Sequence, residues 1–233
     1  MHRMRTFITL GLLWLFASLA GSAQDVDFVI GGGGPSFGIF MPDIDAMSDF
    51  STGLGFPALE GNLLLIGGNG RGGLVPGLAF GGGGWGAWIT ASEGDLDAEL
   101  GLGIGGFEVG YAVGGRTSAV GTVGLLIGMG GSDLTLSGSP FLPVPAPMGI
   151  IPTPTENIYN SVFLVLAPYV EFQIMLLDWA GLSMRAGYVW TPISYDWHDE
   201  GLPDAPGLAL DGTYVSVTLV FGGIIDVNGD GQE

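Results

Sequence analysis

The chain has 233 residues, enough for one domain or one small barrel, and 45 of them are glycine. It has no cysteine, which excludes disulfides and thiolate metal sites, and no lysine, so 23 acidic residues and five arginines give a formal charge of −18. Without clustered basic side chains to neutralise phosphates, the chain is not a nucleic-acid binder.

The amino-terminus predicts an export signal. Basic residues within Met1–Arg5 precede the apolar run Phe7–Leu19, and the small residues Gly21–Ala23 follow it. This is the pattern of a secretory signal peptide, which we expect at residues 1–23, with an uncleaved anchor as the alternative. No later stretch is apolar for long enough to form a spanning helix. A mature chain in a membrane would therefore cross it with strands.

The rest of the chain predicts β-strands, because apolar residues recur at every second position. We expect eight strands, at Val26–Met41, Asn62–Gly68, Leu74–Ala91, Leu96–Val113, Ala119–Leu136, Ser161–Met175, Leu182–Trp190 and Thr213–Phe221.

The predicted connections alternate between short and long. Long loops are expected at Pro42–Gly61, Ser137–Tyr159 and Thr191–Gly212, and a tight turn is expected at Asn69–Gly73, where Asn-Gly supplies positive φ values. Only the connection after the third strand, Ser92–Asp95, is short where the alternation calls for a long one. Alternating short and long connections are typical of outer-membrane barrels.

The last three strands separate apolar from polar side chains most clearly. In Ser161–Met175, for example, Val170 and Phe172 alternate with Tyr169, Glu171 and Gln173. Apolar residues on one face and polar residues on the other suit a barrel with lipid outside and a polar lumen. A half-buried sheet in a soluble protein gives the same alternation.

At four glycine runs, the apolar residues change between odd-numbered and even-numbered positions along the strand. The runs are Gly31–Gly34, Gly81–Gly84, Gly105–Gly106 and Gly130–Gly131. We interpret them as β-bulges within long strands. If each run is a turn instead, there would be about twelve shorter strands in a soluble sandwich or repeat stack.

Four charged residues are predicted to share the interior of the barrel. Glu99, Glu108, Glu171 and Arg185 each lie opposite the apolar face of their strand. Charges there must be paired or hydrated. They would form a structural polar plug or, because carboxylates outnumber the single arginine, a narrow cation-selective path.

His198 is the only histidine after the predicted signal peptide, and it lies in an acidic loop. A histidine beside carboxylates can act as a general base or bind a metal ion. No serine motif accompanies it, so an acyl-transfer enzyme remains a third hypothesis.

The last eight residues, Asp226–Glu233, resemble the opening of a calcium loop of the EF-hand or dockerin type. Asp226, Asn228 and Asp230 match the oxygen ligands, and Gly231 matches the turn position. The resemblance implies a Ca²⁺ site in this tail, although the chain ends before the bidentate glutamate of a full loop. No other cofactor is expected.

The signal peptide, the eight strands, the alternating connections and the aromatic strand faces together resemble small bacterial outer-membrane β-barrel proteins in general. The resemblance implies an all-β fold, a single antiparallel up-and-down barrel at residues 24–223, followed by an acidic tail at 224–233. It implies a non-enzymatic protein in outer-membrane lipid, with a structural role or a weak cation-preferring channel. The acidic loops indicate divalent cations as partners. The alternative is a secreted, soluble β-sandwich or repeat-type protein that acts as an adhesin or as a calcium-dependent surface module.

Overall fold

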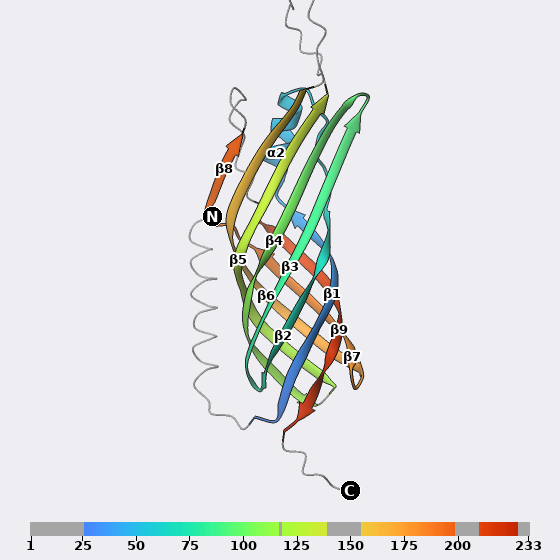
Figure 1. Ribbon diagram of the computed structural model, residues 1–233, viewed down its shortest axis with the longest axis vertical. Coiled ribbons are helices and arrows are strands. Elements are labelled where there is room, and N and C mark those ends of the chain that lie inside the picture. The colour runs from blue at the N-terminus through green and yellow to red at the C-terminus, as the bar shows by residue number, and fades with distance from the viewer. Residues whose placement is uncertain (1–25, 117, 139–154, 199–209, 228–233) are drawn as a thin grey trace, which may run out of the picture.

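The computed structural model describes residues 26–116, 118–138, 155–198 and 210–227. Within them the chain forms nine strands and one helix (Figure 1). In chain order these are β1 (Phe28–Pro42), α2 (Asp45–Gly53), β2 (Leu63–Val75), β3 (Gly77–Glu93), β4 (Leu96–Arg116), β5 (Ala119–Gly138), β6 (Thr155–Leu177), β7 (Ala180–Val189), β8 (Ser194–His198) and β9 (Gly212–Asp226).

All strands except the short β8 close into one antiparallel ring. Each strand from β1 to β7 pairs with its neighbour in sequence, β7 pairs with β9, and β9 pairs with β1. Strand β8 pairs only with β6, opposite Tyr159–Phe163, beyond the point where β7 ends. The expected barrel is confirmed, and the alternative of about twelve strands in a soluble sandwich is wrong. The predicted loop Thr191–Gly212 is also wrong in part, because it contains β8.

The two ends of the barrel differ, and we call them the turn end and the loop end. At the turn end the described termini meet, with Phe28 opposite Asp226, and short turns join β2 to β3, β4 to β5 and β6 to β7. Helix α2 and β8 lie at the loop end, where β5 ends and β6 begins (Figure 1). The β3–β4 hairpin, which turns at Gly94 with φ of +63°, also lies there. The short connection after the third strand is therefore a tight hairpin at the same end of the barrel as α2.

The predicted turn at Asn69–Gly73 is wrong. These residues lie in the middle of β2, where Asn69 pairs with Gly34 of β1 and Gly83 of β3. The chain turns instead between Val75 and Gly77, because Pro76 cannot donate to the ladder.

The glycine runs do not form β-bulges. The pairing of β1 with β2 and of β3 with β4 continues through them without a shift of register. Along β1, Val29 and Phe37 both face outward, while Ile30 and Phe40 are both buried in the interior. The apolar residues change between odd-numbered and even-numbered positions because the interior of the barrel is apolar near both ends and polar between them. The bulge interpretation is therefore wrong.

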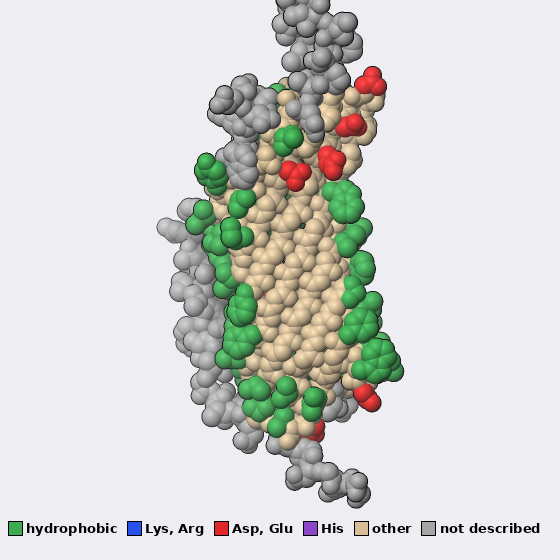
Figure 2. All heavy atoms as spheres, viewed as in Figure 1, with side chains coloured by type: hydrophobic (Ala, Val, Ile, Leu, Met, Phe, Trp, Pro, Cys, Tyr) green, Lys and Arg blue, Asp and Glu red, His purple; other side chains and the backbone are tan. Residues whose placement is uncertain are grey.

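Glycines on the two faces of the wall have different surroundings. The inward Gly128 of β5 lies so close to β4 that an added Cβ would lie 2.1 Å from the carbonyl oxygen of Gly105. On the outer face, an added Cβ at Gly103 would meet nothing within 4 Å. Gly103 pairs with Gly86 and Gly131, so the outer wall carries no side chain at this point. Figure 2 shows a broad tan face of the barrel without hydrophobic or charged side chains.

We expect Gly128→Ala to lower the free energy of unfolding by about 1–3 kcal/mol, because the backbone of β4 must move to admit the methyl group. Gly103→Ala is the matched control. It should be neutral or stabilising by up to about 1 kcal/mol, since alanine restricts the unfolded chain. Urea unfolding of the folded protein measures both, and equal effects would contradict the close approach of β4 and β5.

Two apolar clusters fill the two ends of the interior. The larger lies toward the loop end, where α2 covers it, and Phe50 of α2 packs edge-on against Tyr159 at 5.2 Å. Its fully buried members include Phe40, Leu100 and Phe163. The smaller, at the turn end, consists of Ile30, Val75, Ala79, Ala112 and Val120. Polar side chains occupy the interior between the two clusters.

Candidate functional site

The outer wall of the ring carries a belt of exposed apolar side chains. Phe37, Phe80, Phe107, Phe172 and Val217, from five different strands, are 44–55% exposed. Columns of hydrophobic side chains flank the bare face in Figure 2. A soluble protein rarely leaves so many large apolar side chains exposed to water on one surface.

The belt ends where charged residues begin. Toward the loop end the outward positions include the exposed Glu99 and Asp133. Toward the turn end Trp179 stacks on Phe221 with ring centroids 6.3 Å apart, and aromatic side chains favour a membrane–water boundary. An antiparallel barrel with apolar side chains outside and polar ones inside is the architecture of outer-membrane proteins. The barrel therefore spans an outer membrane.

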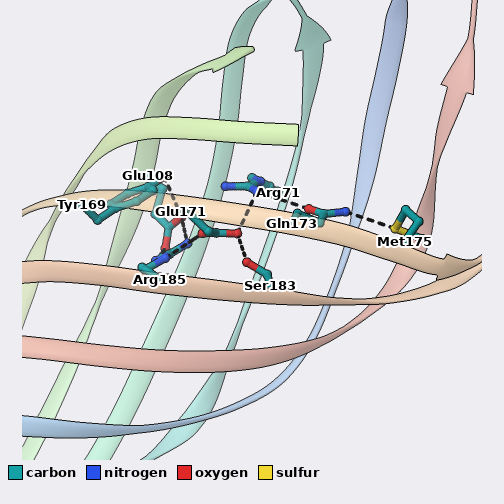
Figure 3. A network of polar contacts seen from close by, with 8 residues as sticks. All are labelled: Arg71, Glu108, Tyr169, Glu171, Gln173, Met175, Ser183 and Arg185. Carbon is teal, nitrogen blue, oxygen red and sulfur yellow. Dashed lines mark hydrogen bonds and ion pairs between the residues drawn. The ribbon is translucent and has the colours of Figure 1, made fainter. Parts of the chain in front are cut away.

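Arg185 of β7 is the centre of the polar layer inside the barrel (Figure 3). Its Nη1 and Nη2 donate to Oε1 and Oε2 of Glu108 on β4, at 2.6 and 2.9 Å. Its Nε donates to Oε2 of Glu171 on β6 at 2.7 Å. The guanidinium also lies over the ring of Tyr169, 4.1 Å from its centroid. One arginine thus joins two carboxylates from different strands.

Further side chains complete this layer, which we call the interior network. Tyr169 donates to Oε2 of Glu108 at 3.2 Å, and Ser183 donates to Oε1 of Glu171. Arg71 contacts Glu171 at 2.7 Å and donates to Gln173 at 3.2 Å, in both cases through Nη2. The interior network consists of Arg71, Glu108, Tyr169, Glu171, Gln173, Ser183 and Arg185.

The interior network is shielded from water. The side chains of Glu108 and Arg185 are 2% exposed, that of Glu171 is 4% exposed and that of Arg71 is 7% exposed. Buried charges persist only when paired and hydrogen-bonded, and here two arginines face two glutamates. The premise that carboxylates outnumber a single arginine inside the barrel is therefore wrong.

The structure brings together three of the four residues predicted to share the interior. Glu171 and Arg185 are direct partners on β6 and β7, and Glu108 reaches them across the barrel. The placement of Glu99 in the interior is wrong, because its side chain is exposed on the outer face. Register continues through Gly105–Gly106, so Glu99 and Glu108 lie on opposite faces of β4.

Arg71 is the member of the interior network that the sequence did not predict, because the Asn-Gly pair before it favours a turn. The alternation of buried residues in β2 does indicate its position. Leu63, Leu65 and Val75 are buried and share its parity, which places Arg71 on the inner face once β2 runs through Asn69–Gly73.

The other predicted sites remain predictions. Asp226 ends β9, while Asn228 and Asp230 lie outside the described residues, as does the predicted signal peptide. Strand β9 continues through Ile224 to Asp226, so part of the predicted tail is strand. His198 ends β8. Among the described residues no group of three or more His, Asp or Glu side chains could hold a metal ion. No helix in the described part of the chain is long and apolar enough to span a membrane.

No family model and no curated protein sequence matches the chain. Its structure is similar to that of Ail of Yersinia pestis, the attachment invasion locus protein, solved with the heparin analogue sucrose octasulfate (9% identity, 86% of this chain and 100% of that one, TM-score 0.44). It is also similar to Neisserial surface protein A (7%, 85% and 96%, TM-score 0.41) and to the outer membrane protease OmpT of Escherichia coli (8%, 86% and 95%, TM-score 0.31). Similarity at this level gives no information about the function of this chain.

Proposed function

We propose that the protein is a sealed, non-conducting and non-enzymatic outer-membrane barrel with a structural role. It anchors its loop end at the cell surface. The observation that supports this proposal is the filled interior, in which two apolar clusters enclose a charge-balanced network.

A conducting pore needs a continuous column of water, and the described interior leaves little room for one. The cavity within the larger apolar cluster, lined by Phe40, Leu65, Trp85 and Tyr214 among others, measures about 20 Å³. That volume holds about one water molecule. Helix α2 covers this cluster at the loop end, with Met47 2% exposed.

The interior network also opposes ion passage. A cation-selective path needs hydrated carboxylates whose charge is available to a passing ion. Here the carboxylates of Glu108 and Glu171 both bind Arg185, and Glu171 also binds Arg71. A passing cation would have to displace these buried ion pairs, which supports a plug over a channel.

Planar-bilayer recording tests the proposal. Protein whose folding is verified by a gel shift on boiling should insert without producing unitary conductance steps, while a known porin in the same bilayer does produce them. The proposal fails if the protein gives cation-selective steps that Glu108→Gln reduces. The matched variant Glu99→Gln changes the same chemistry on the outer wall and should match the wild type in either case.

A further inference from the structure

The wall of the barrel is taller on one side than on the other. Strand β2 pairs with β3 only from Ile66 opposite Gly86 toward the turn end. Strand β3 continues beyond this point to Glu93, paired with β4 alone. No backbone hydrogen bond from the described residues reaches the other side of Ala87–Glu93. We call this segment the β3 edge. With respect to the described residues, the backbone donors and acceptors on its free side are unpaired.

Past Trp88, which is 60% exposed on the outer face, the β3 edge lies in water beyond the apolar belt. On the outer face Thr90 pairs with Glu99, and Ser92 pairs with Asp97. Both acidic residues are exposed, as is Glu93 at the end of β3. Acidic side chains gather at this end of the molecule in Figure 2. Charged side chains on the lipid side of a barrel wall are tolerated only near or beyond the interfaces.

No basic side chain balances this acidic surface among the described residues. Arg71 and Arg185 lie inside the barrel, and Arg116 ends β4 close to the turn end. The inner side of the β3 edge is already occupied, because Ile89 and Ala91 pack against the larger apolar cluster. A ligand would thus meet the backbone edge and the acidic outer face together.

We propose that the β3 edge binds an extended, lysine- or arginine-rich segment of a partner protein as an added strand. Main-chain hydrogen bonds to Ala87–Glu93 provide the affinity. Long basic side chains on the outer face of the added strand reach across β3 to Asp97 and Glu99, and Glu93 adds negative charge at the end of the edge. A second copy of the chain fits poorly, since it would bring the same acidic surface against this one. The inference extends the structural role proposed above to a partner of defined chemistry.

The probe is a fluorescent eight-residue peptide with lysine at alternate positions, added to the folded full-length protein in detergent. We expect saturable binding by fluorescence anisotropy and slower amide hydrogen exchange at Ala87–Glu93. The same peptide with N-methyl groups along one edge keeps its charge but cannot pair, and it should lose binding. Neutralising Glu93, Asp97 and Glu99 together should weaken binding about tenfold.

Matched controls separate strand addition from general attraction of charge. The variant Asp27→Asn/Asp178→Asn removes acidic charge from exposed positions at the turn end and should leave binding unchanged. The proposal is overturned if the peptide does not bind, if the N-methylated peptide binds equally well, or if amide protection arises away from the β3 edge.

Discussion

Replacing Arg185 with alanine should lower the free energy of unfolding by about 3–5 kcal/mol, the largest effect expected for any single change in the interior network. The arginine holds Glu108 through two hydrogen bonds and Glu171 through Nε, at 2.6–2.9 Å. Without it two carboxylates remain buried with one arginine, Arg71, which reaches only Glu171. Urea titration in lipid vesicles, followed by tryptophan fluorescence, measures the loss.

Two comparisons make this result specific. Glu99→Gln, on the outer face of the same barrel, should stay within about 0.5 kcal/mol of the wild type. Removing all four charges together, with Arg71 and Arg185 replaced by methionine and Glu108 and Glu171 by glutamine, should recover most of the loss, because no unpaired charge remains buried. An Arg185→Ala variant as stable as Glu99→Gln would show that the interior network contributes little to stability.

Placing an arginine on the lipid side of the wall should be the next most damaging change. Val217 of β9 faces outward within the apolar belt and is 44% exposed. Val217→Arg should cost about 2–4 kcal/mol in a bilayer, because a charged side chain near the midplane loses its hydration.

The control for this change lies on the same outer surface but beyond the belt. Thr135 of β5 pairs with Glu99, so Thr135→Arg reaches water and acidic neighbours and should cost about 0–1 kcal/mol. Unfolding in vesicles measures both variants. Equal costs for the two would contradict the position assigned to the belt.

The sequence predicted the fold where local pattern and long-range pairing agree. Val170 and Phe172 alternate with Glu171 without intervening glycines. In the structure Val170 and Phe172 face lipid and Glu171 faces the interior, as expected. The Asn69–Gly70 pair favours a turn when considered alone. In the barrel it has strands on both sides, and tertiary pairing overrides local preference.

The interior network was only partly predictable. Glu171 and Arg185 are neighbours on adjacent strands, so their pairing follows from strand order. Glu99 was misplaced because apolar residues were assumed always to face lipid, whereas Leu100 and Leu102 fill the interior. Contacts across the barrel, such as Glu108 with Arg185, depend on the closure of the ring, which no local pattern specifies.

Closure of the ring has a consequence for how the protein is made. The first and last strands of the ring pair with each other, from Phe28 opposite Asp226 to Pro42 opposite Gly212. The ring therefore cannot close until almost the entire chain has been delivered. Such distant pairings form slowly, and until then apolar strands and unpaired edges stay exposed. Biogenesis must therefore protect the unclosed polypeptide from aggregation, and closure of the barrel is a late step.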